Sequence, residues 1–145
     1  MKTWQITEKT VKLIGRTLSD NGTRWLILSA SGFECTVRAK ELSLTLTGDC
    51  TAHPTQQPDG KPEMNQARYA LYVDDVLVTD ACMEEAQKTL TVFKSDTERT
   101  ARVKFLKLSE GTQSYCDKWG ITRKSFCTDI RFTKGNTRAF RHKCK

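Results

Sequence analysis

The strongest constraint on the fold is a strict alternation of apolar and polar residues in the first third of the chain. Apolar residues take every second position over residues 33–39, and again over residues 42–46. A period of two places successive side chains on opposite faces of a strand, one toward a core and one toward water. The apolar positions change from odd to even numbers between the two stretches, which predicts a turn or bulge there.

Other parts of the chain also have the pattern of short strands separated by turns. Residues 25–28 form an apolar run after a turn signal and predict a buried strand, whereas residues 51–66 hold all three prolines and predict an exposed loop. Residues 69–73 and 76–78 predict a hairpin around Asp74-Asp75. Two more strands are expected at 89–93 and 101–108, joined by a polar connection at 95–100; only residues 81–88 have a helical composition.

Length and composition limit the class of protein. A chain of 145 residues suits one domain and can bury a core without disulfides. No apolar run approaches the roughly 20 residues of a membrane helix, and the first residues lack the apolar segment of a signal peptide, so we expect no membrane partner and a cytoplasmic location. Short strands without long helical stretches predict an all-β antiparallel sandwich or barrel.

The positive charge is concentrated at one end. Residues 1–110 contain 15 basic and 15 acidic residues, whereas residues 111–145 contain 9 basic and 2 acidic ones. The C-terminal 35 residues therefore carry the whole net charge of +7. Such asymmetry indicates two segments with different roles. Because the body is neutral, the high isoelectric point by itself is weak evidence for a nucleic-acid partner.

Several of these segments together resemble a known family. They are Gly15-Arg16, residues 28–37, residues 42–49, residues 69–75 and residues 103–110. Over about residues 13–110 the chain is similar to the N-terminal module of family-two carbohydrate esterases. The resemblance rests on strand patterns spread along the module, and not on one invariant motif.

The resemblance implies a fold and a function. Members of this family join a jelly-roll β-sandwich to a C-terminal hydrolase domain of the SGNH/GDSL type, which removes acetyl groups from plant polysaccharides such as xylan and mannan. The family nucleophile is the serine of a Gly-Asp-Ser motif, and the base is a histidine. These 145 residues contain no Gly-Asp-Ser motif. We therefore expect a module truncated before its catalytic domain and inactive by itself, although family members can be secreted.

Candidate reactive residues are few. Gly48-Asp49-Cys50 imitates the family motif, with His53 nearby, but a proline-bearing loop follows where a helix should, so we expect a structural role. The six cysteines are expected to be free thiols, with Cys35 buried. A zinc site would draw on residues too widely spaced to favour it, namely Cys116, Cys127, His142 and Cys144. We expect no catalytic residue, no metal and no cofactor.

Aromatic residues offer two possible binding surfaces. In the basic tail, aromatics interleave with Arg and Lys, a mixture that can bind single-stranded nucleic acid, but no RNA-binding motif frames them. In the body, Tyr72 and Trp4 are the candidates for carbohydrate contact, whereas Trp25 and Tyr69 are expected in the core. Asp74-Asp75 could bind a cation, but a hairpin turn explains the pair with fewer assumptions.

The fold class predicted from these observations is an all-β jelly-roll sandwich with an irregular basic C-terminal tail. Residues 1–110 form the esterase-type module; residues 111–145 form a tail that is a linker remnant, frame-shifted or disordered. The expected partner is a hydrolase domain, in the same polypeptide or in trans, with plant polysaccharide as a further partner. A free-standing carbohydrate-binding module and nucleic-acid binding through the tail are the alternative functions.

Overall fold

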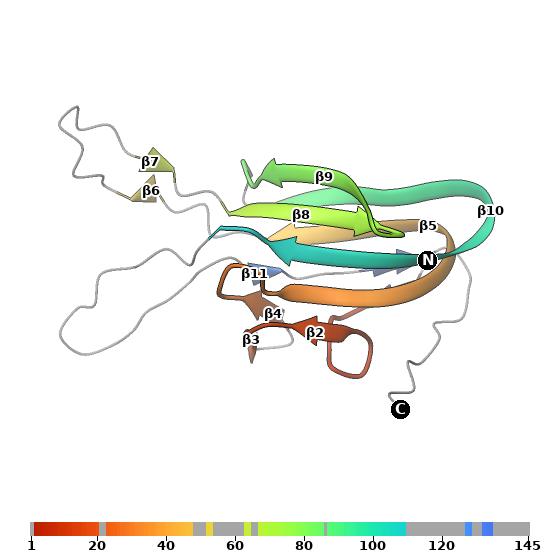
Figure 1. Ribbon diagram of the computed structural model, residues 1–145, viewed down its shortest axis with the longest axis horizontal. Coiled ribbons are helices and arrows are strands. Elements are labelled where there is room, and N and C mark those ends of the chain that lie inside the picture. Colours follow the sequence, from red (N-terminus) through yellow and green to blue (C-terminus); the bar gives the residue numbers. More distant parts are fainter. Residues whose placement is uncertain are drawn as a thin grey trace.

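A computed structural model shows an all-β architecture (Figure 1). It describes residues 2–20, 23–47, 52–53, 63–64, 67–85, 87–109, 127–128 and 132–134. Within this set, side chains are described for residues 5–19, 24–47, 67–85 and 87–109. These residues contain strands, turns and bends and no helix, so no helix among them could cross a membrane.

The strands differ greatly in length. They are β1 (Lys2–Trp4), β2 (Lys12–Ile14), β3 (Thr17–Asp20), β4 (Thr23–Leu26), β5 (Gly32–Thr47), β6 (Ala52–His53), β7 (Glu63–Met64), β8 (Arg68–Val73), β9 (Val76–Cys82), β10 (Gln87–Lys107), β11 (Cys127–Thr128) and β12 (Phe132–Lys134). All but β6 and β7 belong to one ten-stranded sheet, in which every pairing is antiparallel. The predicted all-β class is confirmed.

The two long strands, β5 and β10, organise the sheet. They pair along nearly their whole length, and both bend midway, so that the sheet folds over on itself (Figure 1). The first layer contains β2, the first half of β5, the second half of β10, β8 and β9. The second layer contains the other halves of β5 and β10 with β12, β1, β11, β4 and β3. This arrangement is a jelly-roll-type β-sandwich.

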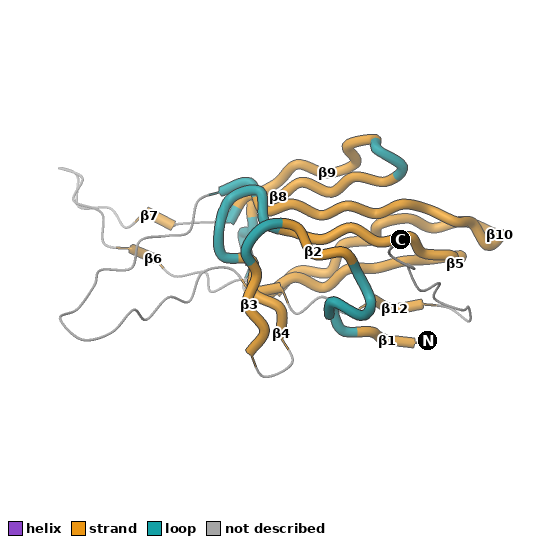
Figure 2. Tube along the Cα trace, turned by 60° about the horizontal axis from the view of Figure 1, so that its bottom comes forward, coloured by secondary structure: helices purple, strands orange, loops and turns teal. Residues whose placement is uncertain are grey.

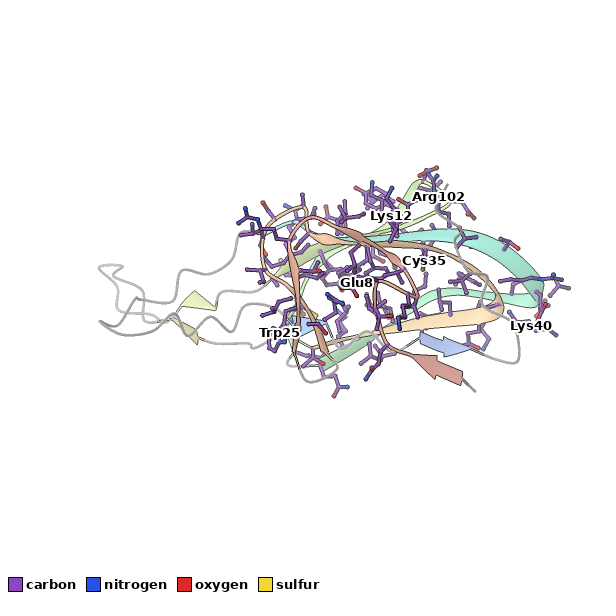
Figure 3. The ribbon with its side chains drawn as sticks, turned by 90° about the horizontal axis from the view of Figure 1, so that it is seen from below. Glu8, Lys12, Trp25, Cys35, Lys40 and Arg102 are labelled. Carbon is purple, nitrogen blue, oxygen red and sulfur yellow. The ribbon has the colours of Figure 1, made fainter. Side chains whose placement is uncertain are left out.

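The bend coincides with the change of parity in the sequence. Lys94 pairs with Glu41, but the next pair along the ladder is Arg99 with Ala39, so residues 95–98 of β10 lie opposite Lys40. Figure 3 labels Lys40 at this end of the sandwich. The predicted irregularity between residues 39 and 42 is therefore confirmed: extra residues in β10 let both strands turn the corner while each keeps its apolar face inward.

The core lies between the two layers. Alternate residues of both halves of β5 are buried, together with their partners on β8 and β10. Phe33, Phe105 and Tyr69 form an aromatic stack across three strands, with ring centroids 5.7 Å and 5.5 Å apart. Offset stacking adds about 0.5–1.5 kcal/mol per pair to the burial of these rings. Tyr69 is completely buried, as predicted.

Several local predictions need correction. Residues 95–100 are not a connection, because β10 continues through them from Gln87 to Lys107. The strand predicted at 25–28 is β4, which ends at Leu26; Leu28 is exposed and Trp25 is only partly buried. Residues 81–85 and 87–88 form no helix, because they include the end of β9 and the start of β10.

Two short pieces of the basic tail belong to the sheet. β11 pairs with both β4 and β5, and β12 pairs with β1 and β5 in the second layer. The other residues of the predicted tail, 111–126, 129–131 and 135–145, lie outside the described part of the chain. The boundary at residue 110 therefore stays a prediction. The proline-bearing segment includes a short hairpin, in which β6 pairs with β7.

Candidate interaction surface at the edge of the first layer

The hairpin between β8 and β9 is a two-residue turn. Val73 pairs with Val76, which leaves Asp74 and Asp75 as the central residues, with φ of 52° and 66°. Positive φ at both positions defines a type I′ turn, whose twist matches that of the flanking strands. Asp tolerates this left-handed region better than most residues because its short side chain bonds locally. The predicted hairpin is confirmed, and the structure specifies the turn type.

Both carboxylates of the turn bind arginines of β10. Asp74 Oδ2 lies 2.5 Å from Arg99, and Asp74 Oδ1 accepts a 2.8 Å bond from the backbone N–H of Arg102. Asp75 forms an ion pair with the Arg102 guanidinium, which also lies 3.8 Å from Glu34. The hydrogen bond from Arg102 lowers the pKa of Asp75. Guanidinium groups thus occupy the position that a cation would take.

A row of side chains crosses the outer face of the first layer at Tyr72. Cross-strand partners in the ladder connect Lys12, Glu34, Lys104, Tyr72 and Leu77. Lys104 Nζ lies 5.6 Å from the centre of the Tyr72 ring, within the range of a cation–π contact. Tyr72 is therefore half-buried, with the ammonium group over its ring. Its role in carbohydrate contact stays a prediction.

The second carbohydrate candidate lies far from the first. Trp4 is the last residue of β1, and its backbone pairs with Phe132 of β12 in the second layer. Its side chain lies outside the described set. Tyr72 belongs to β8 in the first layer. β8 pairs with β10, whereas β12, the partner of β1, pairs with β5 (Figure 2). The ladder therefore does not bring the two candidates together in one row.

Three consecutive aliphatic side chains on β9 are exposed, a feature that the sequence reading missed. Val76, Leu77 and Val78, here called the aliphatic strip, are 63%, 50% and 48% exposed. The sequence predicts a hairpin strand here and makes no prediction about the burial of its side chains. The signal available in the sequence was the run itself: three apolar residues in succession place side chains on both faces of a strand.

The described residues offer no reactive centre. Cys35 lies between the layers, where burial raises the pKa of its thiol to about 12 and keeps it protonated (Figure 3). No group of three or more His, Cys, Asp or Glu side chains in the described set could hold a metal ion. Cys50, Cys116, His142 and Cys144 lie outside that set, and for His53 and Cys127 only the backbone, in β6 and β11, is described.

Solved structures with the same fold are family-two carbohydrate esterases. The enzyme from Cellvibrio japonicus has a TM-score of 0.69 and 14% identity, and the match covers 98% of this chain and 35% of that one. An acetyl xylan esterase from Butyrivibrio proteoclasticus has a TM-score of 0.66 and 16% identity, and its match covers 92% of this chain and 32% of that one. A Clostridium thermocellum esterase in complex with cellohexaose has a TM-score of 0.60 and 14% identity, and its match covers 86% of this chain and 31% of that one. The chain thus spans about a third of these proteins.

The sequence itself matches a family model. No curated protein matches the chain. The model described as "Carbohydrate esterase 2 N-terminal" matches residues 13–125. The match begins where the strand pattern suggested and continues past residue 110 into the basic segment. This chain belongs to the carbohydrate esterase 2 N-terminal family.

Proposed function

We propose that this chain serves as the non-catalytic N-terminal module of an acetyl esterase that acts on plant polysaccharide, with catalysis in a separate hydrolase domain. The observation that carries the proposal is the family match over residues 13–125, combined with coverage of only about a third of each solved esterase. The module would brace the hydrolase domain and help to present the substrate.

The chemistry of the chain supports a non-catalytic role. Hydrolysis of an ester by a serine enzyme needs a nucleophile, a base within hydrogen-bond distance and donors for the oxyanion. The sequence has only two histidines and no Gly-Asp-Ser motif, and the described side chains include no histidine. Arg99 pairs with Asp74, and Arg102 with Asp75 and Glu34, and the two aspartate pairs stabilise the hairpin turn.

The proposed substrate class rests on the relatives. One solved relative is named an acetyl xylan esterase, and another was solved with cellohexaose, a β-linked glucose oligomer. We extend this substrate class, acetylated β-linked plant polysaccharide, to the protein in which this module works.

Acetate release tests the proposal directly. The chain alone should release no acetate from acetylated xylan or from an aryl acetate. A chimera should be compared with the hydrolase part alone: residues 1–145 replace the matched 32% of the Butyrivibrio proteoclasticus enzyme. The chimera should melt at a higher temperature than the hydrolase part. Turnover by the chain alone that Cys50→Ala abolishes would contradict the proposal, as would identical melting and activity with and without the module.

A further inference from the structure

The outer face of the second layer carries hydroxyl and amide side chains. Along the second half of β5 the buried residues are leucines, so the residues between them point outward, and their ladder partners on β10 share that face. These outward residues, here called the hydroxyl face, are Ser43, Thr45, Thr47, Gln87, Thr89 and Thr91. The three on β10 are exposed and the three on β5 are partly exposed. None of the six is charged.

Strand propensity alone does not explain this composition. Threonine suits any exposed strand, but exposed strands of a chain that is 28% charged are expected to carry charges as well. The same two strands meet this expectation in the first layer, where their outward residues include Glu34, Arg38, Arg102 and Lys104. The hydroxyl face therefore differs from the opposite face of the same strand pair in charge and not in backbone structure.

An aromatic and an aliphatic side chain adjoin the hydroxyl face. One row of the ladder crosses four strands, at Thr47, Cys127, Trp25 and Leu18. Because residues directly opposite each other in antiparallel strands share a face, Trp25 points outward like Thr47, and both neighbours of Trp25 along β4 that have the other parity are buried. Trp25 is partly buried, and Leu18 is 54% exposed. Figure 3 shows Trp25 at the end of the sandwich opposite Lys40.

The hydroxyl face is ordered before any partner arrives. Thr45 and Thr89 are cross-strand partners, and their Oγ1 atoms are hydrogen-bonded at 3.1 Å. After this bond the pair keeps one hydroxyl hydrogen and several lone pairs for a ligand. β-branched side chains also have few rotamers, so little conformational entropy is lost when they bind. From β3 to β10 the row spans roughly 19 Å, at about 4.8 Å per strand.

This chemistry favours one class of partner. Nucleic acid requires Lys or Arg for its phosphates, and the cores of protein interfaces are depleted of serine and enriched in aromatics, Met and Arg. The hydroxyl face has neither composition. A neutral polysaccharide matches it, because sugar hydroxyls bond to hydroxyl and amide groups, and the C–H face of a sugar ring packs on an aromatic ring. An extended β-linked chain can follow a flat row of this length.

We infer that the hydroxyl face, together with Trp25 and Leu18, is a binding surface for a neutral β-linked polysaccharide chain. Trp25 stacks against a sugar ring, and Thr45, Thr89 and Gln87 bond to the hydroxyls of the rings that follow. This inference rests on the proposed function, and it specifies which face of the module presents the substrate. It places carbohydrate contact on the second layer and not at Tyr72.

Affinity electrophoresis of the whole chain in gels with soluble xylan, and calorimetric titration with cellohexaose, test the inference. Both sugars should bind, and dextran, an α-linked glucan, should not. The double variant Thr45→Val, Thr89→Val removes two hydroxyls, keeps the side-chain shape and should weaken binding about fivefold or more. Thr36→Val, Thr100→Val is the matched control, because it makes the same changes on the same two strands in the first layer. That control should bind like the parent.

The tryptophan provides a second, independent variant. Trp25→Ala should weaken binding about tenfold, whereas Trp25→Phe, which keeps an aromatic ring, should retain most of the affinity. Thermal unfolding of each variant shows whether it is folded, and the two valine pairs should both melt within a few degrees of the parent. If Trp25→Ala unfolds, the comparison of Trp25→Phe with the parent and the valine variants still decides the result.

The other outcomes contradict the inference. Binding that Tyr72→Ala weakens and the Thr45, Thr89 variant does not would assign the sugar to the first layer. Slower hydrogen exchange of residues 87–91 in the sugar-free chimera than in the free chain would show that the hydrolase part covers this face. A chain that binds neither xylan nor cellohexaose would overturn the inference alone, because acetate release and the melting of the chimera test the proposed function separately.

Discussion

Replacement of Gly32 by alanine should be the most damaging single-methyl change in the module. Gly32 begins β5 and pairs with Leu106 of β10. A Cβ atom at this position would overlap the carbonyl oxygen of Phe105, and would lie 2.9 Å from its carbonyl carbon and 3.1 Å from the Leu106 Cα. All three obstructing atoms are backbone, so no rotamer change can make room.

The cost can be estimated from what must move. Overpacking alone costs about 1–3 kcal/mol. Separation of the strands at this point would also weaken neighbouring ladder bonds, each worth about 1 kcal/mol net, and would shift Phe33 against Phe105 in the aromatic stack. We expect a loss of about 3–5 kcal/mol, a large fraction of the roughly 5–15 kcal/mol that stabilises a domain of this kind.

Urea unfolding followed by tryptophan fluorescence measures this loss. Gly15→Ala is the control, because Gly15 has φ of 65° but its added Cβ would come no closer than 3.1 Å to another atom. That variant should lose only about 1–2 kcal/mol, the cost of a left-handed alanine. If Gly32→Ala unfolds within 1 kcal/mol of the parent, or loses less than Gly15→Ala, the close pairing of β5 and β10 at this position is refuted.

Two further predictions concern a buried thiol and the hairpin turn. Burial raises the pKa of Cys35 from its ordinary 9.0 to about 12, so the unfolded chain releases this proton first and stability should fall from about pH 9 upward. Cys35→Ala should flatten that decline in urea midpoints measured between about pH 8 and 10.5; equal slopes would contradict it. Asp74→Ala should cost about 1 kcal/mol in thermal unfolding, because it removes the acceptor for the Arg102 N–H together with the exposed ion pair to Arg99. Asp75→Ala should cost less, since that carboxylate bonds only a side chain, and an equal cost would show that the backbone bond is unimportant.

Local patterns were sufficient to predict the fold class and much of the first layer. The alternation in β5 and the two-residue turn before β9 depend on residues that are neighbours in the chain. Steric and hydrogen-bonding preferences act at this range, so period and turn chemistry could be inferred without a structure. The burial of Cys35 followed from the alternation, and that of Tyr69 from the general preference of large aromatic side chains for the core.

The continuity of β10 could not be predicted in the same way. Residues 95–100 are polar and resemble a loop, but in the structure they continue the strand through the bend, where residues 95–98 lie opposite Lys40. Arg38 pairs with Glu98 at 3.2 Å, and Lys94 lies 3.9 Å from Glu41. These residues are polar because the bend lies at the end of the sandwich, where the strand meets water on both faces.

The candidate surface was predicted only in part. Tyr72 was recognised because its position is out of phase with its apolar neighbours. The exposure of the strip was not predicted: Leu77 shares the outer face with Tyr72, whereas Val76 shares a face with buried Val73 and is still 63% exposed, and no local pattern encodes how far the core extends. Lys107 is a charged residue that is buried. Its position alternates in phase with the core residues of β10, and its ammonium lies 2.5 Å from the Ser109 carbonyl oxygen.

The amino-acid sequence by itself determined that this protein is an antiparallel β-structure, because alternation and turn residues act between near neighbours; its resemblance to esterase N-terminal modules indicated the family. Only the tertiary structure decided how that sheet folds into two layers and how far the layers overlap. The overlap depends on where β5 and β10 bend together, which is a property of contacts between distant segments.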